Sequence, residues 1–174
     1  AVVDPSEKAL AAARDHYHVP ILARDMNERS LRCDPEVAVL ATPPKGRMEL
    51  LGRLPNLKGL IVEKPLGPSL AEGQALVDYC KQKGIAVQVN FWRRGDEFYR
   101  DLASRAMTDL VGEPYAVFGV YGNGLRNNGS HVIDFVRMLF GEIRSAKVLS
   151  PGASFVEGPL AEDQNLHFLL ELES

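Results

Sequence analysis

The sequence predicts an α/β chain in which a doubly wound parallel sheet is followed by part of a second α/β domain with a mostly antiparallel open sheet. As far as Gly112, short apolar segments alternate with segments whose apolar residues recur at helical spacing, which is typical of parallel strands joined by helices. In residues 165–173 apolar and polar residues instead alternate singly, as in an antiparallel strand with one buried face. We therefore expect one partial domain over residues 1–112 and another over residues 113–174.

Capping signals define the helices of the first domain. Asp4 is expected to cap a helix that has Pro5 at its first position, with Glu7 three residues after the cap. Ser69 and Glu72 form a second capping box. The expected strands are 1–3, 19–23, 37–41, 60–63 and 85–89, and the expected helices are about 5–17, a short one capped by Asp25, 45–54, about 70–83, and one that follows Asp96 and reaches about Leu110.

The second domain is expected to begin with a strand over 114–121, followed by a loop over 122–130 that is rich in glycine and asparagine. A helix over 130–140 has one apolar face and ends at Gly141. The remaining expected elements are strands over 143–149 and 165–173 and a loop over 151–159.

One element of a dinucleotide-binding sheet is absent from the start of the chain. The central strand of such a sheet carries the turn G-x-G-x-x-G, and no such strand or motif precedes Val2. The only G-x-G, Gly122–Gly124, follows the wrong strand and is more simply a turn. Because a sheet without its middle strand has two unpaired edges, we expect the sequence to be an excerpt of a longer polypeptide. The end of the chain within a strand indicates the same.

Composition excludes several classes of function. The 174 residues are 45% hydrophobic and 25% charged, and the net charge of −3 provides no basic surface for nucleic acid or an anionic membrane. No segment approaches the roughly 20 apolar residues of a membrane-spanning helix. Cys33 and Cys80 lack metal-ligand spacing, and His16 and His18 lack a carboxylate or cysteine cluster, so no metal site is expected. Two cysteines fit a reducing compartment, and we expect a cytoplasmic protein.

Lys64 is the first candidate for chemistry. It follows the apolar run 59–62 and Glu63 and precedes Pro65, so it lies beyond the carboxyl end of an expected strand, where ligands bind in open α/β sheets. Burial lowers the pKa of a lysine and lets it exchange protons near neutral pH. The alternative is a lysine in solvent at the end of a strand, which position alone favours.

His131 is the second candidate. It follows Asn127-Asn128-Gly129-Ser130 and opens the helix over 130–140, and a histidine there can titrate near physiological pH. The alternative is a residue that faces solvent or packs on Asp134, three positions later. Taken together with Lys64, His131 favours a proton relay.

These two segments resemble the Glu-Lys-Pro motif and the downstream histidine of the Gfo/Idh/MocA oxidoreductases. The family pattern is roughly G-G-G-x-L-x-D-x-G-x-H-x-I-D, and Gly129, His131, Ile133 and Asp134 match it. The aspartate of that pattern is Asn127 here. An amide can orient a hydroxyl but cannot stabilise an imidazolium by charge, so we expect His131 to be less basic than in a family member with the acid.

The resemblance implies a Rossmann domain and an NAD(P)-dependent dehydrogenase. Such an enzyme transfers a hydride between nicotinamide and a hydroxyl-bearing carbon of a sugar, cyclitol or nucleotide-sugar. By resemblance, Lys64 and His131 handle the hydroxyl proton, Asn127 orients the substrate, and Glu63 and Pro65 hold Lys64 and line the nicotinamide pocket. The open sheet of the second domain commonly forms the oligomer interface in this family, so we expect a homo-oligomer whose other partner is a small polyol or sugar.

Other residues are candidates for cofactor binding. A carboxylate such as Asp4, at the end of a strand, binds ribose hydroxyls and repels a 2′-phosphate, which favours NAD over NADP, although NADP stays possible; the alternative is a helix cap. The residues Ala41, Thr42 and Pro43, with Pro44, resemble a family turn beside the cofactor, or are simply a rigid stop.

A further candidate segment follows the strand expected over 85–89. Asn90, Trp92 and Arg93 resemble the family segment at the end of the next strand. Arg93 either faces the cofactor or an anionic group of the substrate, or pairs with Asp96 or Glu97 at the surface.

Two other hypotheses remain open. The protein can be a non-catalytic dinucleotide-binding sensor on the same fold, because fold does not determine function. It can also be an inert truncated product. Turnover distinguishes them: a sensor binds NAD without reducing it, and an inert product does not bind it.

Overall fold

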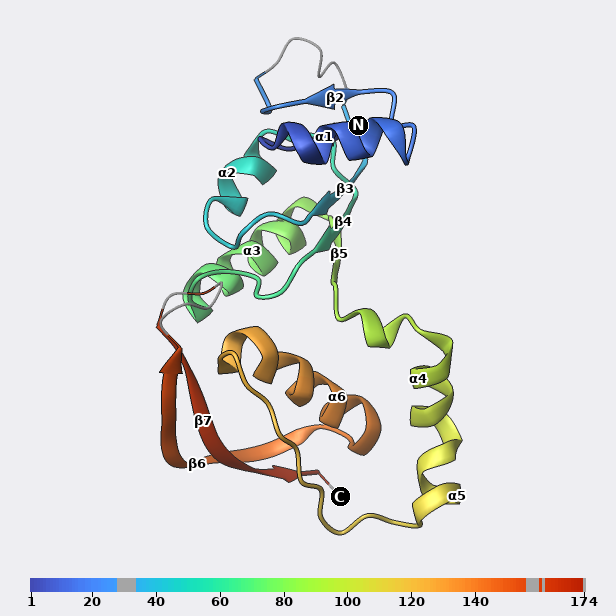
Figure 1. The fold of residues 1–174 in the computed structure, drawn as a ribbon, viewed down its shortest axis with the longest axis vertical. Coiled ribbons are helices and arrows are strands. Elements are labelled where there is room, and N and C mark those ends of the chain that lie inside the picture. Colours follow the sequence, from blue (N-terminus) through green and yellow to red (C-terminus); the bar gives the residue numbers. More distant parts are fainter. Residues whose placement is uncertain (28–33, 156–159, 161, 174) are drawn as a thin grey trace. The chain divides into compact units, whose positions relative to one another are not determined.

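The computed structural model describes residues 1–27, 34–155, 160 and 162–173, and these form two compact units (Figure 1). The first unit comprises Ala1–Val62 with Gly67–Gln88, and the second comprises Glu63–Leu66 with Val89–Ser174. The domain boundary near Gly112 stays a prediction, since the units divide the chain at other positions. Residues 89–112 belong to the second unit because they pack on its helix, as the contact between Tyr99 and Phe135 illustrates.

The first unit contains two sheets, and the smaller one pairs β1 (Val2–Val3) in parallel with β2 (Leu22–Ala23). Helix α1 (Glu7–Asp15) connects the two strands. Its N-cap is Ser6, whose Oγ accepts a hydrogen bond from the backbone N–H of Ala9. The prediction that Asp4 caps the helix is therefore wrong: its Oδ1 accepts from the N–H of Ser6, and this turn delays the helix until Glu7.

One further prediction for this region is wrong in extent, since the strand expected over 19–23 contains only Leu22 and Ala23. The Asp25 side chain accepts a hydrogen bond from the N–H of Asn27. The helix expected after Asp25, with Glu28, lies largely outside the described residues and stays a prediction.

The larger sheet of the first unit has the strand order β3-β4-β5. Strands β3 (Val37–Leu40) and β4 (Gly59–Val62) are parallel, and β5 (Ala86–Val89) lies beside β4. Helices α2 (Arg47–Gly52) and α3 (Leu70–Lys83) contribute to the core of this unit. Its buried apolar side chains include Leu40, Leu51, Leu57, Leu60, Val62, Leu76, Cys80 and Ile85.

Helix α3 forms as expected. Ser69 Oγ accepts from the N–H of Glu72, and Gly84 ends the helix with a positive φ of 68°, a conformation that glycine adopts without steric cost. The strand over 37–41 was expected to be buried, but only one of its faces is. Val37 and Val39 are exposed, and Ile61 of β4 and Val87 of β5 are also open to solvent.

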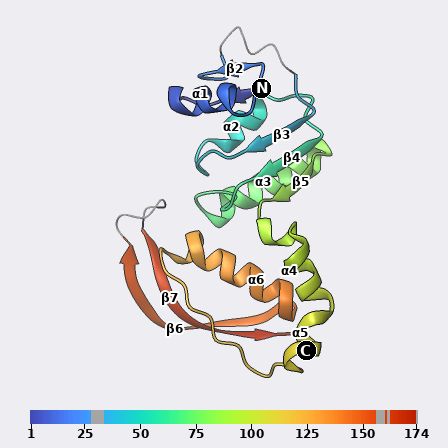
Figure 2. The same cartoon turned by 45° about the vertical axis from the view of Figure 1, so that its right-hand side comes forward.

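The second unit is built around α6 (Ser130–Phe140) and an antiparallel pair of long strands, β6 (Ile143–Phe155) and β7 (Asp163–Leu172). Helix α6 lies over one face of this pair in both views (Figure 1, Figure 2). The other elements of this unit are η1 (Trp92–Arg94), α4 (Glu97–Asp101), η2 (Leu102–Ala106), α5 (Met107–Val111) and η3 (Leu125–Gly129).

Several expectations for this unit are confirmed and others are wrong. Asp96 caps α4, and α6 covers the residues expected. The strand expected over 114–121 is absent, since that segment forms no strand ladder. Tyr121, at the end of this segment, contacts β7 through hydrogen bonds of its hydroxyl with the backbone of Leu166. Strand β6 continues to Phe155, through part of the loop expected over 151–159, because it stays paired with β7 there.

The fold class is confirmed: a Rossmann-like arrangement with parallel strands is followed by an antiparallel sheet. Among the described residues, no helix is both long and apolar enough to cross a membrane.

Candidate functional site

The segment Glu63–Leu66 follows β4 and belongs to the second unit, where Lys64 makes two hydrogen bonds. The Lys64 Nζ donates to the backbone carbonyl of Asn127 at 2.8 Å and to its side-chain Oδ1 at 2.9 Å. Lys64 is half-buried, so the alternative of a lysine free in solvent is wrong. The structure therefore brings together two of the three residues expected to carry chemistry, across 63 positions of sequence.

Burial is the main influence on the charge of Lys64. Loss of hydration lowers the pKa of the amine below its ordinary value of 10.5, while the charges of Glu63 and Asp163 act in the opposite direction. A lowered pKa increases the fraction of neutral amine near pH 7, and a neutral amine can accept a proton.

His131 lies in the first turn of α6 and is half-buried. The Phe91 ring meets the imidazole edge to face, with ring centroids 5.8 Å apart. Burial lowers the pKa of His131 below 6.5, and the positive charges of Lys64 and Arg93 lower it further. The lowered pKa favours the neutral imidazole near pH 7, and Lys64 is near enough for its positive charge to disfavour protonation of His131.

The alternative in which His131 packs on Asp134 as a surface pair does not describe the site. Asp134 is buried, and its Oδ1 accepts from Arg94 Nε at 2.8 Å. The carboxylate of Asp134 only partly offsets the effects that lower the pKa of His131.

Glu63 and Asn90 connect the two chain segments that enter the second unit. The Nδ2 of Asn90 donates a hydrogen bond to Glu63 Oε1. This contact joins the residue before Lys64 to the residue before Phe91, which packs on His131. The predicted positions Glu63, Lys64, Asn90, Asn127 and His131 thus form one connected cluster within the second unit.

Arg93 lies over an aromatic ring. Its guanidinium carbon is 4.6 Å from the ring centroid of Trp92 and 6.0 Å from that of Tyr99. None of the ion pairs in the described part of the chain joins Arg93 to Asp96 or Glu97, and Asp96 Oδ1 accepts from the N–H of Tyr99 as the cap of α4. The alternative of a surface ion pair is therefore wrong, and stacking on Trp92 orients the guanidinium.

Asp163 is a site residue that the sequence analysis missed. It opens β7, is 3% exposed, and accepts hydrogen bonds from the backbone N–H groups of Arg126 and Asn127 at 2.9 and 2.8 Å. The only signal in the sequence is an acid at the start of a strand whose following residues alternate in polarity. That signal does not distinguish a buried acid from an exposed one.

The other predicted cofactor residues, Asp4, Ala41, Thr42 and Pro43, lie in the first unit. Thr42 offers the clearest indication of a missing ligand, because its Oγ1 is buried without a hydrogen-bond partner. Its backbone carbonyl accepts from a guanidinium nitrogen of Arg47, a side chain that is 2% exposed. A cofactor hydroxyl or amide at the turn would satisfy this hydroxyl, so the residues present are compatible with a dinucleotide.

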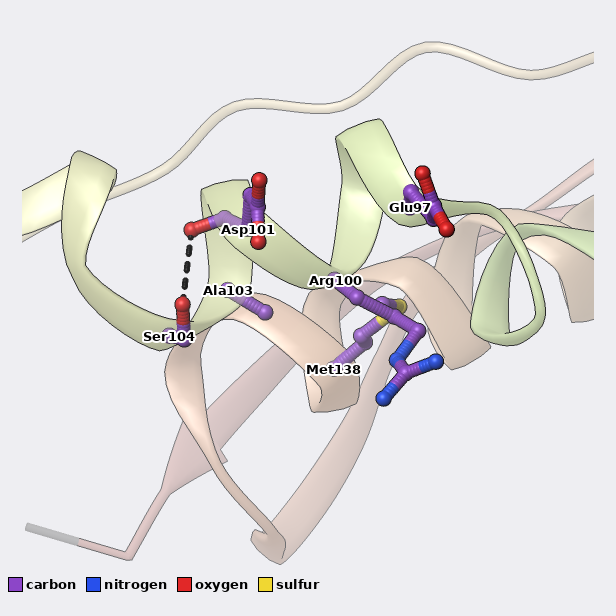
Figure 3. Close-up of a pocket in the computed structure, with 6 residues that line it drawn as sticks. All are labelled: Glu97, Arg100, Asp101, Ala103, Ser104 and Met138. Carbon is purple, nitrogen blue, oxygen red and sulfur yellow. Dashed lines mark hydrogen bonds between the residues drawn. The ribbon is translucent and has the colours of Figure 1, made fainter.

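An open cavity of about 580 Å³ lies elsewhere in the second unit, between residues of α4, η2 and α6 (Figure 3). None of the residues of the Lys64 cluster lines it, and a hydrogen bond from Ser104 Oγ to the carbonyl of Asp101 is the contact drawn there. Among the described residues no group of histidine, cysteine or acidic side chains could hold a metal ion. The cavity is lined by Glu97, Arg100, Asp101, Ala103, Ser104 and Met138.

The match of the chain to a protein-family model shows which family it belongs to. Residues 1–91 match the Gfo/Idh/MocA model, which is described as an oxidoreductase family with an NAD-binding Rossmann fold. The chain belongs to this family. The match covers more than half of the 174 residues and includes the Glu63-Lys64-Pro65 motif.

Two similar proteins are named as dehydrogenases of inositol and of a cyclic diol. The chain is 32% identical over 105 residues to scyllo-inositol 2-dehydrogenase (NAD(+)) of Bacillus subtilis, an alignment that covers 60% of this chain and 29% of that protein. It is 26% identical over 176 residues to trans-1,2-dihydrobenzene-1,2-diol dehydrogenase of Xenopus tropicalis, covering 80% of this chain and 53% of that protein. The chain thus spans about half the length, or less, of these relatives.

Solved structures confirm the fold. An oxidoreductase of Agrobacterium radiobacter in complex with NAD+, L-tartaric acid and magnesium superposes with a TM-score of 0.70 at 18% identity, covering 98% of this chain and 54% of that one. A scyllo-inositol dehydrogenase of Lactobacillus casei with bound NAD(H) and scyllo-inositol gives a TM-score of 0.62 at 17% identity, covering 85% of this chain and 51% of that one.

Proposed function

We propose that the intact protein is an NAD-dependent dehydrogenase that oxidises a CH–OH group of a small polyol. The observation that carries the proposal is the hydrogen-bonded cluster in which the half-buried Lys64 amine meets Asn127 beside His131. Membership of the oxidoreductase family and the inositol and dihydrodiol dehydrogenases among the relatives support it. Of the substrate classes expected, a cyclitol or related cyclic diol has the most support.

Lys64 is proposed to take the hydroxyl proton. Alcohol oxidation removes a proton from oxygen and a hydride from carbon and leaves a carbonyl, so a neutral amine beside the hydroxyl becomes an ammonium as the reaction proceeds. Bound NAD supplies the chemistry of hydride acceptance at its nicotinamide ring. The lowered pKa of Lys64 makes the neutral amine available at a pH where the free side chain is charged.

His131 and Asn127 are proposed to position the hydroxyl. A neutral imidazole can accept a hydrogen bond from the substrate or relay its proton to solvent. Asn127 presents its Oδ1 to Lys64, so its amide hydrogens are the atoms that it can offer to a substrate oxygen. Neither residue needs to change charge during substrate binding.

The cofactor is proposed to be NAD rather than NADP. Asp4 stands directly after β1, where a carboxylate can bind ribose hydroxyls while repelling a 2′-phosphate. Its bond to Ser6 uses Oδ1 and leaves the second carboxylate oxygen for such a contact. The unpartnered Thr42 Oγ1 supports a cofactor contact at the turn that also contains Ala41 and Pro43. The remaining residues proposed to contact the cofactor are Glu63, Lys64, Pro65, Asn90, Trp92 and Arg93.

The intact protein is further proposed to form a homo-oligomer through its antiparallel sheet. Val148 and Leu149 of β6 and Leu169 of β7 are 57%, 62% and 54% exposed, and a second copy of the chain packed on the sheet would cover apolar strand residues of this kind. Light scattering on the purified protein should give a multiple of the monomer mass. A monomer at micromolar concentration would contradict this proposal.

The activity test is NADH formation by the intact protein with a panel of cyclitols, cyclic diols and sugars. Turnover should rise with pH as Lys64 loses its proton, and this rise should occur below the ordinary pKa range of lysine. Lys64→Ala should lower turnover by about 10²- to 10⁴-fold and keep most of the NAD affinity, because the other proposed contacts remain, whereas Lys83→Ala, at the exposed end of α3, should behave as wild type. Equal activity of the wild type and Lys64→Ala would contradict the proposed role.

A non-catalytic NAD sensor is the second candidate, and Asn127 is the observation that favours it. An uncharged amide replaces the acid of the family pattern, so the site has less charge with which to stabilise a protonated His131. A sensor would bind NAD in calorimetry and produce no NADH from any polyol in the panel.

A further inference from the structure

Asp163 is a buried acid whose carboxylate accepts hydrogen bonds from the turn before α6. We infer that Asp163 is a positioning residue for Asn127 and Lys64, and that its carboxylate supplies negative charge near the Lys64 amine, where the chain has Asn127 in place of an acid. This inference rests on the proposed function, since it assigns a role within that site. It starts from the place of Asp163 at the first residue of β7, in a strand that approaches η3 from a distant part of the sequence.

The two carboxylate oxygens of Asp163 bind consecutive backbone N–H groups. Oδ1 accepts from Arg126 at 2.9 Å and Oδ2 accepts from Asn127 at 2.8 Å. Hydrogen bonds to a charged acceptor are stronger than neutral ones, and two of them restrain both the position and the orientation of the turn. Asn127 is therefore anchored through its backbone while its carbonyl and side-chain oxygens receive the Lys64 amine.

Gly124 lets the carboxylate come this close. A Cβ at Gly124 would lie 2.1 Å from Asp163 Oδ2 and 2.3 Å from its Cγ, and the backbone there has a positive φ of 90°. Both the space and the dihedral angle therefore require glycine. The N–H of Gly124 also donates to Asn165 Oδ1 at 2.9 Å, so two side chains of β7 hold this turn.

The charge of Asp163 reaches the Lys64 amine. Glu63 and Asp163 are the acids that favour the ammonium form of Lys64 against the effect of burial, and His131 is the titratable neighbour on α6. The charged groups around His131 are Lys64, Arg93, Glu63 and Asp134. Because residue 127 is an amide and not an acid, Asp163 of β7 provides negative charge near the Lys64 amine.

Arg126 offsets only part of this charge. Its Nε lies 3.5 Å from Asp163 Oδ1, and its side chain is 42% exposed, so solvent weakens the pair. The carboxylate of Asp163, by contrast, is 4% exposed, so its field acts on the protein interior with little screening.

The experiment measures the titration of Lys64 without requiring turnover. In the intact protein, the rate at which an amine-specific reagent labels Lys64 is followed against pH by mass spectrometry. Asp163→Asn should shift the labelling curve to lower pH, because the loss of a nearby negative charge favours the neutral amine. Adding Asn127→Asp to Asp163→Asn should return the curve toward that of the wild type, and the exposed control Asp109→Asn should leave it unchanged.

Turnover provides the second readout. Asp163→Asn should lower kcat between about tenfold and a hundredfold through misplacement of the turn, with NAD affinity unchanged. If this variant does not fold, Asp163→Glu keeps the charge and changes its reach, so kcat should fall while the labelling curve stays in place. A wild-type curve for folded Asp163→Asn, or a wild-type kcat for Asp163→Glu, would overturn the inference.

The two proposals fail in different ways. If no polyol is oxidised but the labelling curve shifts as stated, the dehydrogenase proposal fails and the influence of Asp163 on Lys64 stands. If the wild type oxidises a polyol and the Asp163→Asn curve does not move, only the inference about Asp163 fails.

Discussion

Arg47 in the first unit and Lys64 in the second are both basic side chains that are at least partly buried, but they differ in their exposure and in the groups that accept their hydrogen bonds. Arg47 is 2% exposed and donates to the backbone carbonyl of Thr42. Lys64 is half-buried and donates to both oxygens of Asn127, with acids close by. A guanidinium stays protonated at any relevant pH, whereas burial brings an amine toward its titration range. The comparison teaches that burial leaves the guanidinium of Arg47 charged, whereas it lowers the pKa of Lys64 toward a pH at which an amine can exchange a proton.

Replacing Lys64 by arginine is the strongest test of this difference. Lys64→Arg keeps the positive charge but cannot release the proton, so we expect turnover to fall by about 10²- to 10⁴-fold, as for Lys64→Ala. NADH formation and calorimetric NAD binding measure the two effects separately. Substantial turnover by Lys64→Arg would mean that Lys64 acts through its charge alone.

Removing the Arg47 side chain tests the structural half of the comparison. Arg47→Ala leaves a cavity and an unsatisfied carbonyl at Thr42, so we expect a loss of about 2–4 kcal/mol in the free energy of unfolding. Urea denaturation measures this loss. The exposed Arg14→Ala should change stability by less than about 0.5 kcal/mol. Equal stability of Arg47→Ala and the wild type would show that the buried guanidinium has no structural role.

The uncharged hydrogen bond made by Ser69 is a reference against which the stability contributed by Arg47 can be compared. Ser69→Ala removes the cap that accepts from the N–H of Glu72, and we expect a loss of about 1 kcal/mol. The same denaturation experiment measures it, with Ser104→Ala as an exposed serine of the other unit for control. A larger loss for Ser69→Ala than for Arg47→Ala would reverse the ranking argued here.

The smallest expected effect is the contribution of His131 to acid sensitivity. Its folded pKa lies below 6.5, so below about pH 6.5 the unfolded chain binds a proton that the folded chain does not. Stability therefore falls as the pH falls from 6.5 toward the folded pKa, and is unaffected by this group above 6.5. His131→Asn should flatten this part of a plot of unfolding free energy against pH, whereas the exposed His16→Asn should not.

The sequence predicted best where the interactions are local. Helix α3 has its cap, its length and its terminal glycine within sixteen consecutive residues, and it forms as expected. The expected strand over 114–121 has the right apolar residues, yet a strand also needs a partner at its edge, and residues alone do not provide one. Asp4 and Ser6 are likewise both suitable N-caps for α1 by residue type. In the structure Asp4 accepts from the N–H of Ser6, and Ser6 accepts from the N–H of Ala9 and caps the helix.

For the site, the sequence by itself determined which positions match the family's motif. Lys64 and His131 became candidates through that match, since their places after a strand and at the start of a helix alone favour ordinary surface residues. Only the tertiary structure decided that Asn127 receives the Lys64 amine and that Asp163 anchors Asn127 from β7. The physical reason is that burial and long-range charge set a pKa, and neither exists until distant segments of the chain pack together.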